Sequence, residues 1–190
     1  MKIGVLTAMT SEFEQLAAML DGVAECERND IQYLVGRVGE NEIILRQCGI
    51  GKVNAALGAA ELIRAFSPDA MVSTGVAGGI DCCLGVMDVV VSSSIVYHDV
   101  WCGMGCEYGQ VQGMPAVFAA DEAMCRAAES LNNDADNKTR IHAGLICTGD
   151  QFITNRDELD KIKGNFLPVW LLIWSRLPLR RHAISTVCRS

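Results

Sequence analysis

Short apolar segments alternate with helical segments along most of this chain, and this alternation limits the folds that it can adopt. Strands are predicted at residues 2–8, 70–74, 86–97 and 141–147, where apolar residues form short runs bounded by turn-forming residues. Strands that are apolar on both faces and separated by helices are typical of α/β folds. We therefore predict an α/β fold with one central mixed β-sheet flanked by helices.

A first helix is expected directly after residues 2–8. Phe13, Leu16 and Leu20 are spaced to share one helical face. Thr10 or Ser11 is expected to cap this helix, with Glu14 as the partner of Ser11 in a capping box. The other expected elements are strands at 31–38 and 42–48, helices at 52–66, 121–131 and 155–163, a glycine-rich turn at 75–79 and a glycine-rich loop at 98–118.

Composition narrows the possible partners and compartments. The net charge of -7 argues against nucleic acid, because phosphate backbones require a basic binding face. The chain has no run of 18 apolar residues and no signal-peptide pattern at its N-terminus, so neither a membrane span nor export is expected. The nine cysteines are odd in number and lack C-x-x-C spacing, which indicates reduced thiols in a cytoplasm and no zinc site.

Glycines or polar residues follow several predicted strands, at the sheet edge where α/β folds bind ligands. The segments 8–12, 48–53, 73–79 and 148–153 are of this kind, and they lack the spacings of a P-loop or a dinucleotide-binding loop. Each segment can also be explained without a ligand. Glu12 would then be an acid in the first helical turn that complements the helix dipole. The glycines would form plain turns, and Phe152 would be an ordinary core residue. The segments are therefore candidate ligand-binding sites.

The pair His98-Asp99 is a weaker candidate for catalysis. A serine hydrolase would need a G-x-S-x-G turn, which this chain lacks. Neighbouring residues in a strand point to opposite faces, so these two side chains are not expected to orient each other. We expect a structural or subunit-contact role.

Taken together, the segments resemble the 5'-methylthioadenosine/S-adenosylhomocysteine nucleosidases of the nucleoside phosphorylase superfamily. The matching stretches are collinear over residues 1–166: MKIGVLTAM with Glu12, CGIGKVNAALGA, STGVAGGI, VVVSSSIVYHDV, EYGQ and CTGDQFI. The resemblance implies hydrolysis of the N-glycosidic bond of an adenine thio-nucleoside with release of adenine, as in methionine salvage and adenosylhomocysteine detoxification. It implies a small-molecule nucleoside as partner, a homodimer, and neither cofactor nor metal. It leaves open the ranking of methylthioadenosine, adenosylhomocysteine and 5'-deoxyadenosine as substrates.

The resemblance also implies roles for individual residues. Glu12 matches the carboxylate that activates the attacking water, and it is the one catalytic residue carried over. Val76 stands where many relatives have Ser, and Met104 where relatives often have an aromatic residue. The implied substrate-binding residues are Met9 and Ile50 beside the ribose and alkylthio group, Val76, Ala77 and Gly78 under the ribose and base, Phe152 stacked on adenine, Ile153 reading the base edge, and Met104 in the neighbouring subunit's pocket.

The composition changes abruptly after Phe166. Residues 167–190 contain four Arg and no Asp or Glu, whereas residues 1–166 contain 23 acidic and 12 basic residues. In the family, a ribose-binding Glu in a Met-Glu motif and the Asp that protonates adenine lie after this point. We therefore divide the chain into a nucleosidase domain at 1–166, which is incomplete at its C-terminus, and an aberrant basic tail at 167–190.

Codon arithmetic predicts that this tail is read out of frame. With one permitted set of codons for Leu172 to Ser190, a start one nucleotide earlier gives VDMESAAIAQTCYLYRVPF, which resembles the family's next segment. We call the chain that continues in that frame after residue 166 the frame-restored chain. The 190-residue chain itself is expected to be poorly stable and inactive, or nearly so. The strand that should follow residue 163 is expected to be lost, which would expose a sheet edge and apolar surface. Val169 to Trp174 is apolar enough to replace that strand, whereas Pro178 and the arginines should prevent any long strand beyond it.

Two other functions remain open on the residues alone. A nucleoside phosphorylase would need basic side chains around a phosphate near the ribose, and the near-absence of Arg and Lys from the glycine-rich segments favours hydrolysis. The other alternative is a non-catalytic adenine-nucleoside binder or an inert fragment.

Overall fold

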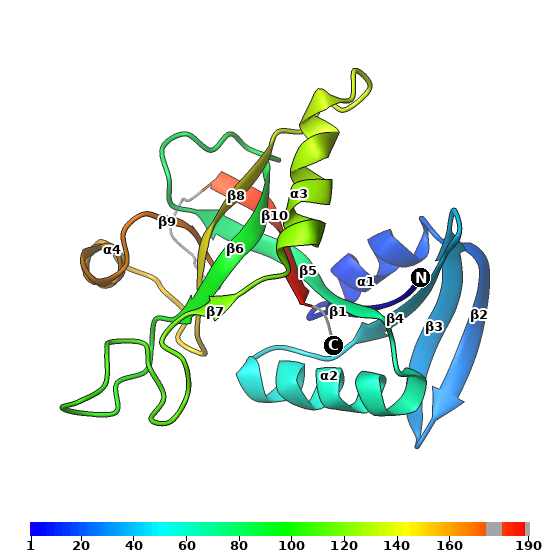
Figure 1. Cartoon of the computed structure of the whole chain (residues 1–190), viewed down its shortest axis with the longest axis horizontal. Coiled ribbons are helices and arrows are strands. Elements are labelled where there is room, and N and C mark those ends of the chain that lie inside the picture. The colour runs from blue at the N-terminus through cyan, green and yellow to red at the C-terminus, as the bar shows by residue number, and fades with distance from the viewer. Residues whose placement is uncertain (174–179, 189–190) are drawn as a thin grey trace. The chain divides into compact units, whose positions relative to one another are not determined.

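The computed structural model describes residues 1–173 and 180–188, and it describes side chains for residues 1–173. The chain divides into two compact units, which are built on Met1–Gly75 and on Val76–Ser185 (Figure 1). Among the described residues, no helix is long and apolar enough to cross a membrane.

The first unit is a mixed sheet with a helix on each side (Figure 1). Its strand order is β5-β1-β4-β3-β2, in which β1 is parallel to β4 and β5 while β3 is antiparallel to both of its neighbours. Buried side chains of the strands and of α2 meet in its core, including Leu6, Ile44 and Leu62. Its elements are β1 (Lys2–Thr7), α1 (Thr10–Ala17), β2 (Asp21–Arg28), β3 (Ile31–Val38), β4 (Asn41–Gln47), α2 (Lys52–Phe66) and the beginning of β5 (Ala70–Gly79).

The second unit continues from the end of β5 in the order β5-β9-β8-β6-β10, and β7 pairs with β6. Its two α-helices have side-chain caps: Asp121 accepts a hydrogen bond from the Met124 N–H, and Asn155 accepts one from the Glu158 N–H. Its elements are β6 (Val89–Tyr97), β7 (Phe118–Ala119), α3 (Glu122–Ser130), a 3₁₀ turn (Leu131–Asn133), β8 (Ile141–Thr148), α4 (Arg156–Asn165), β9 (Val169–Leu172) and β10 (Arg180–Cys188).

The predicted fold class is confirmed. The four strands on which it was based are β1, β5, β6 and β8, and all belong to one hydrogen-bonded strand order. The strand β2 was not predicted, because nearly all of its residues are polar or exposed. The cap of α1 was predicted wrongly: Met9 is the N-cap, Glu12 is its partner, and the helix ends before Leu20.

Two further predictions fail where β-strands extend beyond their expected limits. Residues 75–79 form the end of β5 rather than a turn, because Gly78 and Gly79 pair with Leu172 and Leu171. β10 is a nine-residue strand in the segment where none was expected. Its arginines stand at its start and its β-branched residues follow, so Ala183 to Ser185 can pair with Val89 to Val91 of β6. Pro178 lies outside the described residues.

The first residues of the tail belong to the core of the second unit. Val169, Leu171 and Leu172 are 4% exposed or less, and β9 pairs with both β5 and β8. Trp170 lies against Gly144, where the Cβ atom of any larger residue would be only 2.4 Å from the indole. The expected loss of a strand after residue 163 is therefore wrong: the apolar residues of the tail replace it as β9, which lies between β5 and β8.

Candidate active site

Glu12 is held at the junction between β1 and α1. One carboxylate oxygen, Oε2, accepts hydrogen bonds from the backbone N–H groups of Ala8 at 3.1 Å and Met9 at 3.0 Å. The side chain is half-buried. Glu12 thus lies in the first turn of α1 and caps it, in agreement with the structural role considered for it. The same two contacts fix its carboxylate at the carboxyl end of β1.

Gly75 brings the backbone of β5 against this carboxylate. A Cβ atom at Gly75 would lie 2.7 Å from Glu12 Oε1 and 3.0 Å from Cδ, closer than side chains tolerate. A larger residue here would therefore displace the Glu12 carboxylate. Sequence reasoning placed Gly75 in a glycine-rich segment but gave it no role; its position directly after a buried strand was the available signal.

The thiol of Cys48 lies near Glu12 but does not offer a competing nucleophile. Burial raises the pKa of Cys48 above its ordinary value, and the negative charge of Glu12 adds a smaller shift in the same direction. Its Sγ donates a hydrogen bond to the carbonyl oxygen of Thr7 at 3.3 Å. A raised pKa keeps the thiol protonated, and a thiol is a much weaker nucleophile than a thiolate.

The other two predicted residues of the first unit are accessible. Met9 is half-buried, and Ile50 is exposed between Gly49 and Gly51, both of which have positive φ. The turn is stabilised by Asn54, whose side-chain amide donates a hydrogen bond to the Ile50 carbonyl oxygen at 2.7 Å. The first unit therefore presents a carboxylate and apolar side chains after the carboxyl ends of β1 and β4.

In the second unit, Val76, Ala77 and Gly78 lie in β5 rather than in a loop. Val76 is exposed, whereas Ala77 packs in a core cluster with residues that include Ile146 and Leu171. Only Val76 of these three thus presents its side chain at the surface of the unit. Any contact of Ala77 or Gly78 with a ligand would involve the backbone.

Phe152 and Ile153 have opposite environments. Phe152 is 38% exposed, as a ring that stacks on a ligand must be, while Ile153 is 1% exposed and packs in a core cluster. Ile153 is predicted to read the base edge through its backbone, and the burial of its side chain holds that backbone in place. The resemblance implies that these two residues contact the same nucleoside as Glu12, and this stays a prediction.

His98 and Asp99 support the turn that leads to Phe152. β6 ends at Tyr97, so the expectation that these side chains point to opposite faces of a strand is wrong. The N–H of His98 donates to the Thr148 carbonyl oxygen at 2.9 Å, and Asp99 Oδ2 accepts from the N–H of Asp150 at 2.6 Å. Both side chains lie within 3 Å of where a Gly149 Cβ would be, which gives them a structural role.

Met104 is fully exposed in the long segment between β6 and β7. Gly103 and Gly105 on either side have positive φ, a conformation that glycine adopts without strain.

A pocket of about 640 Å³ also lies in this unit, lined by residues that include Tyr108, Phe166 and Trp170. None of the predicted site residues is among its lining residues.

Comparison with known proteins places the chain among nucleoside-cleaving enzymes. Residues 2–167 match the model of the family described as the phosphorylase superfamily. The 5'-methylthioadenosine/S-adenosylhomocysteine nucleosidase of Actinobacillus succinogenes is 36% identical over 191 residues, which cover all of this chain and 80% of the relative. The protein with the same description from Chromohalobacter salexigens is 39% identical over 166 residues, 87% of this chain and 70% of the relative.

A solved structure has a similar fold. The crystal structure of a nucleosidase with this specificity from Colwellia psychrerythraea 34H, in complex with adenine, has a TM-score of 0.85 and 32% sequence identity. The similarity covers 97% of this chain and 80% of that one.

Proposed function

The chain belongs to the 5'-methylthioadenosine/S-adenosylhomocysteine nucleosidase family within the phosphorylase superfamily, and we propose that residues 1–166 carry the water-activating part of its site. The reaction is hydrolysis of the N-glycosidic bond of an adenine thio-nucleoside, which releases adenine. The observation that carries the assignment is the carboxylate of Glu12, fixed by two backbone amides and lying against Gly75.

The chemistry explains why a fixed carboxylate is needed. Cleavage of an N-glycosidic bond builds positive charge on the ribose, much as glycosidase reactions do. A carboxylate beside C1' withdraws a proton from the attacking water and stabilises that charge. Glu12 supplies this group, while the exposed ring of Phe152 stacks on the adenine and Val76, Met9 and Ile50 contact the rest of the nucleoside.

Adenine release tests this function against a non-catalytic binder. The frame-restored chain is incubated separately with methylthioadenosine, adenosylhomocysteine and 5'-deoxyadenosine, and free adenine is measured by chromatography. We expect catalytic release from at least one of the first two. Stoichiometric nucleoside binding with no adenine above the uncatalysed background would support the binder instead.

We also propose that residues 167–190 are an out-of-frame tail. The match to the family model ends at residue 167, and the composition changes at the same place. The apolar residues of β9 pack well, yet they bring no carboxylate to the site. Sequencing the gene across the codon for Phe166 gives the direct check of this proposal.

A homodimer and a cytoplasmic location complete the proposal. The fully exposed Met104 between two glycines is suited to enter a second subunit's pocket. Where the structure describes side chains, none of the eight cysteines forms a disulfide, as expected in a reducing compartment. Burial raises the pKa of Cys147 to about 12, so this thiol serves as a small apolar side chain.

Gly75→Ala should lower turnover by moving the carboxylate of Glu12. The added methyl group overlaps Oε1, and a displacement of about 1 Å at a reacting group costs on the order of 10²-fold in rate. We expect kcat of the frame-restored chain to fall by about this factor, with a smaller change in KM. Gly164→Ala in α4 is the control, because nothing lies within 4 Å of its added methyl group. Unchanged kcat in a folded Gly75→Ala protein would contradict this role.

A further inference from the structure

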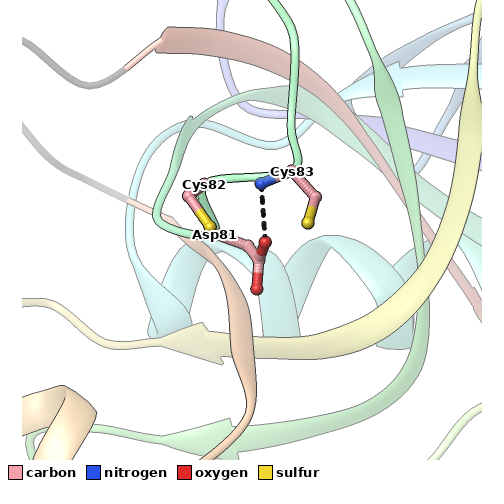
Figure 2. Close-up of side chains that lie close together, drawn as sticks. All are labelled: Asp81, Cys82 and Cys83. Atoms are coloured by element: carbon pink, nitrogen blue, oxygen red, sulfur yellow. Dashed lines mark hydrogen bonds between the residues drawn. The ribbon is translucent and has the colours of Figure 1, made fainter.

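An exposed turn after β5 brings two thiols and a carboxylate together. The potential ligand atoms of Asp81, Cys82 and Cys83 all lie within 4.8 Å of one another. Figure 2 shows the three side chains on the same side of the turn, with the Asp81 carboxylate between the two sulfur atoms. The nucleosidase reaction uses none of these residues.

The backbone of this turn is fixed on both sides. The N–H groups of Ile80 and Asp81 both point to the carbonyl oxygen of Trp170, at 2.9 and 3.4 Å. On the other side, Leu84 is 1% exposed, and its N–H donates to the Asp81 carbonyl oxygen at 3.3 Å. The exposed thiols are thus displayed by a segment that is anchored in the core.

Asp81 is also oriented within the turn. Its Oδ1 accepts a hydrogen bond from the backbone N–H of Cys83 at 2.8 Å (Figure 2). This contact holds the carboxylate beside the two thiols, and both cysteines are free and exposed. A bound ion would therefore find the carboxylate in place, and the two thiols would need only side-chain rotation to reach it.

The donor set selects a class of ion. Thiolates favour zinc and softer ions, and carboxylates are also zinc ligands. Tetrahedral geometry with Zn–S bonds of about 2.3 Å requires sulfur atoms about 3.8 Å apart. The two sulfur atoms are at most 4.8 Å apart, about 1 Å more than that value, and rotation of exposed cysteine side chains can supply the difference.

We propose that Asp81, Cys82 and Cys83 form a surface site for a thiophilic divalent cation of the Zn²⁺ and Cd²⁺ class, with water completing the coordination. No metal site was expected from the sequence because the chain lacks C-x-x-C spacing. That criterion does not detect a site made of two adjacent cysteines next to an acidic residue. The site stands apart from the proposed nucleosidase function, because it contains none of the residues assigned to it.

Titration with Cd²⁺ tests the site. The 190-residue chain is kept reduced with a non-thiol phosphine, and the ultraviolet thiolate-to-cadmium charge-transfer band is followed, with Zn²⁺ as competitor. We expect a saturable band at one ion per chain. Loss of an outer-shell partner already weakens metal sites by about 10–100-fold, so Cys82→Ser and Cys83→Ser should each weaken binding at least tenfold. Asp81→Asn should weaken it by a smaller factor.

Cys102→Ser is the matched control, because Cys102 is also an exposed, free cysteine but lies outside the turn. It should leave the titration unchanged. Equal binding by the parent chain, Cys82→Ser and Cys83→Ser would overturn the proposal, as would an equal loss in Cys102→Ser. If the 190-residue chain aggregates, the same titrations are made with the frame-restored chain and its variants. Their folding is followed by circular dichroism.

Discussion

Glu12→Gln should abolish measurable adenine release by the frame-restored chain while leaving nucleoside binding intact. The substitution removes the only group assigned to activate water, and loss of such a group typically costs about 10²–10⁴-fold in rate. Both backbone amides donate to a single oxygen of Glu12. The carbonyl oxygen of Gln can accept both hydrogen bonds, so α1 should keep its cap and the site its shape.

The measurement compares kcat, the nucleoside Kd under non-turnover conditions and the thermal unfolding temperature. Glu14→Gln is the control, since Glu14 is an exposed acid on the same helix; it should alter none of the three. Near-normal turnover in Glu12→Gln would refute the assignment of the base. Loss of binding and of stability together would show that Glu12 serves only as a helix cap.

The 190-residue chain should release adenine at least about 10²-fold more slowly than the frame-restored chain. The two chains share residues 1–166, so any difference between them arises from the residues after Phe166. In the family, the ribose-binding Glu and the acid that protonates adenine lie in that part, whereas residues 167–190 contain no Asp or Glu. Without a general acid, the adenine must leave as an anion.

The structure changes the expected cause of any loss of stability. An open sheet edge after α4 was the expected defect, yet β9 fills that position with buried Val169, Leu171 and Leu172. We therefore expect cooperative thermal unfolding of the 190-residue chain, at a lower temperature than for the frame-restored chain. Turnover close to that of the frame-restored chain, from a soluble and cooperatively folded 190-residue protein, would contradict the proposal for the tail.

The elements that the sequence predicted are those whose local pattern decides their structure. We could predict β1, β6 and β8 from their apolar runs, and α2 from its small apolar residues, without knowing what these elements pack against. By contrast, β2 is almost entirely exposed, and only pairing with β3 makes it a strand. Its residues carry no apolar alternation from which a strand would be predicted.

The residues of the candidate site also differ in whether a local pattern or a distant contact determines their role. Glu12 and Phe152 were identified from their positions after predicted strands and from the family resemblance. The role of Gly75 depends on its distance from Glu12, more than 60 residues away in the chain. Likewise, Gly78 and Gly79 were expected in a turn because their pairing partners, Leu172 and Leu171, lie in the tail. Contacts between distant segments decide such features.

The phosphate dependence of adenine release tests the central claim, that this chain derives from a hydrolase. Initial rates with methylthioadenosine are measured for the frame-restored chain in phosphate-free buffer and again in saturating phosphate, and the sugar product is identified by phosphorus NMR. The account predicts equal rates and a free sugar in both buffers. A rate that requires phosphate, together with a sugar 1-phosphate product, would contradict it and identify a phosphorylase.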